Sequence, residues 1–387
     1  MRNGLRIYDS DTHVQPSAET LEPYLERDVR DRVPNLADFL SPVKIGLAGE
    51  VREEPYRHAY RFARSTPPVD GAPRILGEAA PRPGAVRRFQ KFMGTRFPTE
   101  GGAGDDAKIR LSDMDEEGVD VHMMVPPGAN DHAEPVVEMG FIRAQNRYLD
   151  EFCSADPHRL KSLVVTSARC IDESLAEIQR WARSPWVAGI QPYYPPGYPL
   201  DHPDLEPIWA AAEDANLTVC HHSFVAGEWP GYRDIWENPF LSRSASHPWS
   251  AMRAVASLFG SGIMDRHPTL RYAILESGFG WLPFWAKRMD DQAVYMGTVA
   301  EGLKHKPSEY MSSGRFFSST VVHEGAEMIR MVSKLLGDGI LMWSSDYPHA
   351  ESRFPKSVDI FLDWKTLDEP LQTKLRWDNA VRCFGEP

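Results

Sequence analysis

The sequence predicts an α/β fold, a closed (β/α)8 TIM barrel of parallel strands with a long irregular insertion after the first strand. Two observations support this prediction: eight apolar strand candidates alternate with helical patterns, and no glycine-rich GxGxxG motif follows any of them. Such alternation is typical of a parallel sheet closed by helices. An open dinucleotide-binding sheet would need the glycine motif. A length of 387 residues suits one large barrel with insertions.

The strands and helices follow one another in the order that a barrel requires. Helix 205–215 shows the clearest pattern, because Leu205, Ile208, Trp209 and Ala212 recur at the spacing of one helix face. Gly118 is expected to end an earlier helix. The expected strands are 5–8, 119–125, 160–166, 187–191, 217–221, 270–276, 315–320 and 340–345, and the expected helices are 109–118, 141–154, 172–182 and 205–215.

Residues 35–107 interrupt this order. The stretch is rich in Pro, Gly and Arg and has little apolar periodicity apart from a short helix candidate at 86–93. Loops of this length in a compact protein are usually functional insertions. We therefore expect one metal-dependent barrel domain over residues 1–387, with 35–107 serving as a lid or an oligomer contact.

Composition excludes several classes of partner. The formal charge is −12, from 43 basic and 55 acidic residues, which disfavours binding to nucleic acid or an anionic membrane surface. The sequence has neither an apolar run of membrane-spanning length nor a signal peptide, so a cytoplasmic location is expected. Its four cysteines show no CxxC spacing, which favours buried thiols over disulfides or a zinc–cysteine site.

Carboxylates and imidazoles follow four of the eight expected strands. Active sites of barrel enzymes lie at the carboxyl ends of the strands, and unpaired charged groups rarely end apolar strands. Asp11 and His13 also point to the same side of a strand, with Thr12 opposite. Convergence on a metal ion is the simplest explanation. The side chains are Asp11 and His13 after strand one, His221 and His222 after strand five, Glu276 after strand six, and Asp346 and His349 after strand eight.

Two further histidines have structural alternatives. His122 lies within a strand and is expected to be a core residue. His247, in Ser246-His247-Pro248, fits equally well as a pocket residue or as a helix cap.

The chain resembles the amidohydrolase-related branch of the amidohydrolase superfamily, which includes aminocarboxymuconate-semialdehyde decarboxylase and γ-resorcylate decarboxylase. The matching motifs cover nearly the whole chain outside the insertion. They are Asp11-x-His13, the run Arg110-Leu111-x-x-Met114-Asp115, Asn146-Arg147-Tyr148, Leu205-Glu206-Pro207-Ile208-Trp209, Glu276-Ser277-Gly278-x-Gly280-Trp281 and Ser345-Asp346-Tyr347-Pro348-His349.

The resemblance implies a ligand set and a reaction class. Asp11, His13 and His221 would bind the metal, with His222 as the alternative to His221, and Asp346 would bind metal or act as general base. We choose His221 because it directly ends the apolar strand. The implied reaction is hydrolysis or non-oxidative decarboxylation of a small carboxylate-bearing substrate, within a homo-oligomer or a hetero-oligomer with a related subunit.

Glu276 departs from the family pattern, because the decarboxylases carry a histidine at this place. It makes the donor set oxygen-rich and able to bind one or two ions, with zinc expected first and manganese or iron as alternatives. We therefore count Glu276 with Asp346 among the catalytic residues. A second hypothesis is a non-haem iron or iron–manganese oxygenase, because a branch with this barrel that includes the subunits of 2-aminoisobutyrate hydroxylase resembles such oxygenases. A third hypothesis is a scaffold subunit of such an enzyme.

Overall fold

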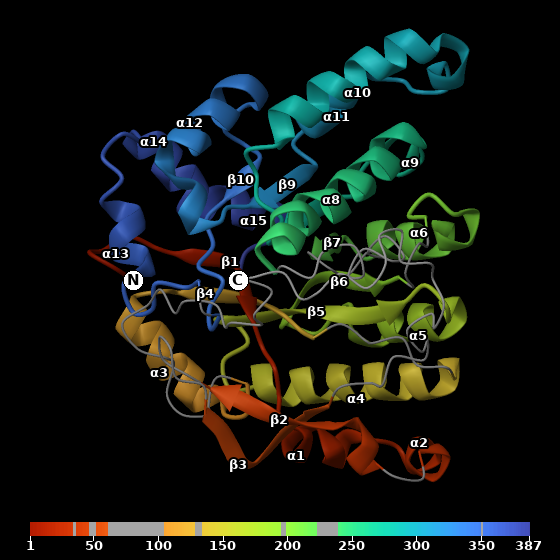
Figure 1. Ribbon diagram of the computed structural model, residues 1–387, viewed down its shortest axis with the longest axis vertical. Coiled ribbons are helices and arrows are strands. Elements are labelled where there is room, and N and C mark those ends of the chain that lie inside the picture. Colours follow the sequence, from red (N-terminus) through yellow and green to blue (C-terminus); the bar gives the residue numbers. More distant parts are fainter. Residues whose placement is uncertain are drawn as a thin grey trace, which may run out of the picture.

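Eight parallel strands form one sheet in the order β1-β4-β5-β6-β7-β8-β9-β10 (Figure 1). The computed structural model describes residues 1–33, 36–45, 52–60, 104–127, 134–194, 199–222, 239–349 and 351–387. The strands are β1 (Tyr8–His13), β4 (Val121–Val125), β5 (Leu160–Ser167), β6 (Val187–Tyr193), β7 (Thr218–His222), β8 (Tyr272–Leu275), β9 (Phe316–Ser319) and β10 (Leu341–Met342).

The sheet closes into a barrel through the segment that follows β10. The Ser10 amide donates to the Trp343 carbonyl at 3.1 Å, and the Asp346 amide donates to the Asp11 carbonyl at 3.1 Å. The His13 amide donates to the Tyr347 carbonyl at 2.6 Å. These bonds join the last strand to the first, so the predicted (β/α)8 barrel is confirmed.

Helices follow the strands around the outside of the barrel (Figure 1). The four predicted helices are present, and the one that Gly118 was expected to end does end there, with φ +83° at this glycine. The helices are α1 (Ala18–Leu21), α2 (Arg27–Arg32), α3 (Ala107–Glu117), α4 (Pro135–Cys153), α5 (Ile171–Trp181), α6 (Glu206–Asp214), α8 (Pro239–Gly260), α9 (Ile263–Arg266), α10 (Leu282–Met296), α11 (Pro307–Met311), α12 (Gly325–Leu336), α13 (Ser357–Leu362), α14 (Glu369–Thr373) and α15 (Asn379–Phe384).

The strands bury apolar side chains on both faces, as strands of a parallel barrel must. One cluster includes a residue from each of the eight strands and therefore fills the barrel interior; Cys220 is its member on β7. The larger cluster joins the outer face of the strands to the helices, and Val219 belongs to it. On β7, the side chains thus alternate between outside and inside.

Within the expected insertion, β2 (Leu40–Ile45) and β3 (Arg52–Tyr60) pair in an antiparallel sheet beside α1. Residues 61–103, with the helix candidate at 86–93, lie outside the described residues. The role of 35–107 as a lid or an oligomer contact therefore stays a prediction. All four cysteines are free and buried, as expected. Among the helices in the described ranges, none has the length and apolar character needed to cross a membrane.

Candidate metal centre

Three carboxylates and three imidazoles meet at the carboxyl end of the barrel. His13 Nε2 lies 2.9 Å from Asp346 Oδ1 and 3.2 Å from Glu276 Oε2. All the side chains are buried except that of His349, which is partly exposed. The cluster consists of Asp11 and His13 of β1, His222 of β7, Glu276 directly after β8, and Asp346 and His349 after β10.

Both β1 residues face the cluster, as strand alternation predicted. Asp11 Oδ1 lies 3.8 Å from His13 Nε2. Thr12 points the other way, and its hydroxyl donates to the Met123 carbonyl at 3.0 Å. The two-residue spacing therefore delivers two potential ligands to one point.

The choice of His221 rather than His222 as the ligand after strand five is wrong, because the side chain of His221 points away from the cluster. His222 Nε2 lies 3.0 Å from Glu276 Oε2, whereas His221 Nε2 shares a 3.2 Å hydrogen bond with Ser250 of α8, outside the barrel. Burial and the neighbouring His222 lower the pKa of His221 to about 3. Because Cys220 points inward, alternation sends His222 inward and His221 outward. The apolar pattern placed the strand correctly but did not establish which of its faces is the interior.

The backbone at Glu276 and Asp346 is in the left-handed region, with φ +45° and +60°. Side chains other than glycine rarely adopt this conformation, at a cost of about 1–3 kcal/mol, and it is frequent at functional sites. Ser319, at the end of β9, supports both neighbours: its hydroxyl donates to Asp11 Oδ2 and accepts from the Glu276 amide, each at 3.0 Å. The sequence reasoning missed Ser319, and only its place at a strand end could have suggested it.

The electrostatics separate the carboxylates. Burial raises the pKa of Asp11 to about 6, against the opposing effect of His222 and His13. Burial also raises the pKa of Glu276, but the imidazoles of His222 and His13 outweigh it and hold that pKa well below the usual range.

Asp346 and His349 form a similar pair. Burial and the Glu276 carboxylate raise the pKa of Asp346, but the imidazoles of His349 and His13 outweigh both and lower it. Burial lowers the pKa of His349, but Asp346, whose Oδ1 lies 2.9 Å from His349 Nδ1, raises it to about 10. Asp346 is therefore ionised at neutral pH.

These donor atoms fit a divalent cation. Buried atoms of the cluster form no regular hydrogen bond among the described residues, although His13 Nε2 is in ion-pair contact with Glu276 and Asp346: Asp11 Oδ1, His13 Nε2, Glu276 Oε2 and both carboxylate oxygens of Asp346. The potential ligand atoms fall into two sets that share His13, and within each set all the atoms lie within 4.8 Å of one another. One set is His13, Glu276, Asp346 and His349, and the other is Asp11, His13 and His222. Buried polar atoms are normally satisfied, and carboxylate–imidazole sets suit zinc, manganese or iron.

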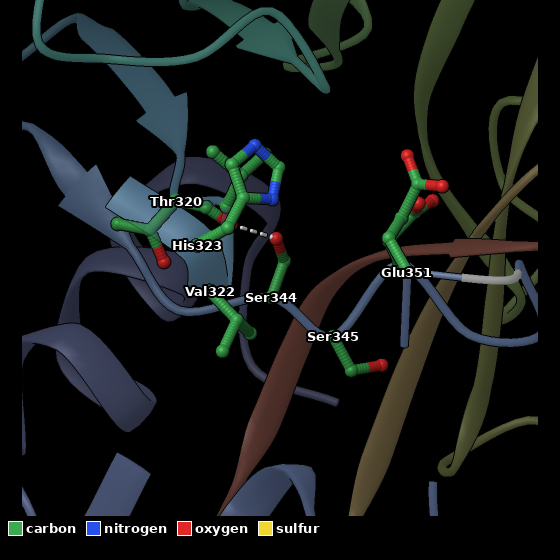
Figure 2. A pocket seen from close by; sticks show the side chains of 8 residues that line it. Thr320, Val322, His323, Ser344, Ser345 and Glu351 are labelled. Atoms are coloured by element: carbon green, nitrogen blue, oxygen red, sulfur yellow. Dashed lines mark hydrogen bonds between the residues drawn. The ribbon is translucent and has the colours of Figure 1, made fainter. Parts of the chain in front are cut away.

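A small pocket, shown in Figure 2, is lined in part by Asp346 of the cluster. Its volume is about 10 Å³, enough for about one water molecule. In Figure 2, His323 and Glu351 lie on either side of Ser344, whose hydroxyl donates to the Thr320 carbonyl. The pocket is lined by Thr320, Val321, Val322, His323, Ser344, Ser345, Asp346 and Glu351. His323 was not foreseen. The side chain of His247 lies outside the described part of α8.

A parallel barrel with carboxylates and imidazoles at the carboxyl ends of its strands has the architecture of a metal-dependent barrel enzyme. The chain belongs to the amidohydrolase family, whose family model matches residues 11–385. The predicted family and the prediction of an enzyme are thus confirmed.

Three similar proteins are decarboxylases. The 2-amino-3-carboxymuconate-6-semialdehyde decarboxylase of Dictyostelium discoideum is 24% identical over 286 residues, which cover 72% of this chain and 77% of that protein. The 5-carboxyvanillate decarboxylase of Sphingomonas paucimobilis superposes with a TM-score of 0.64 at 24% identity, covering 75% of this chain and 86% of that one.

The 5-carboxyvanillate decarboxylase of Novosphingobium aromaticivorans, solved with bound manganese, gives a TM-score of 0.67 at 18% identity, covering 99% and 98%. At these identities the structural likeness establishes the fold. None of the three supports the oxygenase alternative.

Proposed function

We propose that this protein is a metal-dependent decarboxylase of a small aromatic carboxylate. The observation that supports the proposal is a set of buried atoms able to bind a metal at the carboxyl end of the barrel. They belong to Asp11, His13, Glu276 and Asp346 and form no regular hydrogen bond among the described residues. The decarboxylase relatives named above supply the reaction class. Manganese in one of the similar structures makes Mn²⁺ a test ion to set beside zinc.

Asp11, His13, His222 and Asp346 are the residues that would hold the ion, and Glu276 lies close enough to join them. When bound, a divalent ion supplies Lewis-acid polarisation of a substrate oxygen and neutralises negative charge. The imidazoles of His222 and His13 also stabilise the negative charge of Glu276, since they lie 3.0 and 3.2 Å from its Oε2.

Asp346 is the group placed to move a proton. Its Oδ1 is directed toward His13 and His349, while its Oδ2 is buried without a hydrogen-bond partner among the described residues. As an ionised carboxylate it can accept a proton from a substrate hydroxyl at Oδ2. It can then return that proton to the ring carbon, whose bond to the carboxylate breaks as CO2 leaves.

Hydrolysis is the second candidate, and Glu276 is the observation that favours it. The decarboxylases that the sequence resembles carry a histidine where this chain has a carboxylate. Two ionised carboxylates, Glu276 and Asp346, could accept a proton from an attacking water. The two reactions share the same residues and differ in their products.

The test is product analysis with a panel of hydroxybenzoates and related aromatic carboxylates, using enzyme loaded with Mn²⁺ or Zn²⁺. We expect CO2 release that chelation abolishes, and a loss of at least 100-fold in kcat for Asp346→Asn, which keeps the shape but not the base. Asp338→Asn, before β10 at the opposite end of the barrel, is the control and should leave kcat unchanged.

Metal-loaded enzyme that releases no CO2 from any member of the panel but cleaves esters or lactones would replace decarboxylation by hydrolysis. Activity that survives both chelation and Asp346→Asn would contradict the metal-centred proposal altogether. The ratio of metal to protein in the same preparation decides between one ion and two. The expected homo-oligomer, or hetero-oligomer with a related subunit, stays a prediction, which light scattering tests.

A further inference from the structure

Arg110 of α3 lies fully buried behind the first-strand ligands. Its Nη1 donates to the His13 carbonyl and its Nη2 to the Thr12 hydroxyl, each at 2.7 Å. Its Nε donates to His122 Nδ1 at 3.2 Å. One guanidinium therefore contacts the His13 backbone and the preceding Thr12, whose side chain points away from the cluster.

His122 is suited to accept this bond. Burial, together with Arg110 itself, holds the pKa of His122 well below its usual value, so the ring is neutral. A neutral imidazole that accepts at Nδ1 carries its proton on Nε2. The histidine that the sequence marked as a core residue thus holds the guanidinium in place from β4.

The same guanidinium reaches the segment that carries Asp346. Its carbon lies 5.1 Å from the centre of the Tyr347 ring, next to Asp346 in the chain. The Tyr347 hydroxyl donates at 2.6 Å to Asp113, three residues after Arg110 and so on the same face of α3. One helix face therefore contacts two segments that the His13 amide and the Tyr347 carbonyl already join.

A guanidinium suits this position because its donors form a rigid planar fork, which fixes several acceptors relative to one another. Lysine would offer one charged nitrogen at the end of a flexible chain and could not hold three acceptors in that arrangement. Since a metal site binds well only when its ligands are already in place, the residues that orient ligands commonly change affinity by 10- to 100-fold.

We propose that Arg110 is a positioning residue of the metal centre, which fixes His13 and the Asp346–Tyr347 segment in the arrangement that binds the ion. This inference rests on the proposed function, because it assumes that the cluster holds a divalent metal. Arg110 itself touches neither the ion nor the substrate.

The test compares Mn²⁺ binding and folding in matched variants. We expect Arg110→Met to weaken Mn²⁺ binding by 10- to 100-fold, measured by the electron paramagnetic resonance signal of free Mn²⁺. Arg110→Lys should recover only part of that affinity. The control is Arg315→Met, because Arg315 also donates to two backbone carbonyls, those of His267 and Met264, but before β9 at the other end of the barrel.

Thermal melting of the same samples separates positioning from general destabilisation. Arg315→Met should lower the melting temperature and leave Mn²⁺ affinity unchanged. Thr12→Val, which removes one acceptor of Arg110 and keeps the side-chain shape, serves if Arg110→Met does not fold, and we expect it to weaken binding several-fold.

The outcomes separate this inference from the function it rests on. Wild-type protein that binds no Mn²⁺ or Zn²⁺ would remove the proposed metal centre. Tight binding by wild type, with equal affinity in Arg110→Met or, where that variant does not fold, in Thr12→Val, would leave the centre intact and overturn the role of Arg110. Equal weakening by Arg315→Met would reduce the effect to stability and also overturn it.

Discussion

His221 and His222 are adjacent residues that serve opposite sides of the barrel wall. His222 lies against Glu276 in the cluster, whereas His221 shares a hydrogen bond with Ser250 of α8. We predict that His222→Ala weakens Mn²⁺ binding by at least 10-fold with a modest change in stability. His221→Ala should keep Mn²⁺ affinity but destabilise the fold by about 1–3 kcal/mol, because the substitution removes the buried hydrogen bond between His221 and Ser250 and leaves a cavity.

Metal titration and chemical denaturation of the two variants check this prediction, and each variant is the control of the other. If His221→Ala lost the metal while His222→Ala retained it, the inward orientation of His222 would not describe the binding state.

Single residues also show how far the sequence could define the site. Asp11, His13, Glu276 and Asp346 could be expected to lie together because each lies at or after the end of an expected strand, and the carboxyl ends of parallel strands meet. His222 could not be chosen over His221, since adjacent residues at a strand end give no sign of which faces the axis. Ser319 and Arg110 act through hydrogen bonds from other segments, and sequence spacing does not reveal such contacts.

At the scale of elements, the loop after β8 positions Glu276. The carboxylate of Glu324, after β9, accepts from the amide of Phe279 at 3.2 Å and from that of Gly280 at 2.7 Å. Gly278 has φ +68°, and a Cβ there would lie 2.4 Å from Glu324 Oε1. The loop therefore depends on a glycine at this place, both for its backbone conformation and for its contact with Glu324.

We predict that Gly278→Ala destabilises the protein by about 1–3 kcal/mol, from left-handed strain and displacement of Glu324. Mn²⁺ affinity should fall as well, because the displaced loop carries Glu276. Calorimetry and Mn²⁺ titration measure the two effects. Gly302→Ala is the matched control, since a Cβ at Gly302 meets nothing within 4 Å and this glycine has no left-handed φ. An alanine tolerated equally at both positions would refute the dependence on Gly278.

Elements were predicted more accurately than their ends. Seven of the eight barrel strands were located from their apolar residues, but the first was expected at 5–8, whereas β1 spans Tyr8–His13 and contains Asp11 and His13. The polar side chains of Asp11 and His13 can belong to a buried strand because they contact the cluster rather than solvent. Helix α4 begins at Pro135, six residues before its clear apolar pattern, because proline is favoured in the first turn of a helix.

At the scale of the whole molecule, the same hydrogen bonds close the barrel and bring the residues of the site together. The bonds that join β1 to the segment after β10 place Asp11 and His13 beside Asp346. Of the strands whose ends contribute to the cluster, β1 and the last one are farthest apart in the sequence. The alternation of strands with helices along the sequence could predict a barrel. The register that brings these distant residues together arises only in the closed sheet.

A metal ion should therefore stabilise the whole fold. The ion would offset the negative charge of the buried carboxylates of Asp11, Glu276 and Asp346. A ligand that binds only the folded state adds stability that grows with the logarithm of its concentration relative to the dissociation constant. At 100 times the dissociation constant, Mn²⁺ should contribute about 2.7 kcal/mol. For a chain of this size that corresponds to a rise in melting temperature of roughly 3 °C.

Calorimetry of chelated and Mn²⁺-loaded protein measures this rise, which at the same Mn²⁺ concentration should fall to about half or less in His222→Ala, because its affinity is at least 10-fold weaker. Ca²⁺ serves as a second comparison, because it prefers oxygen ligands over imidazole and should stabilise less. Identical melting of the chelated and loaded wild-type protein would mean that closure of the barrel is independent of the ion, since a ligand held by residues from both ends of the sheet must resist its opening.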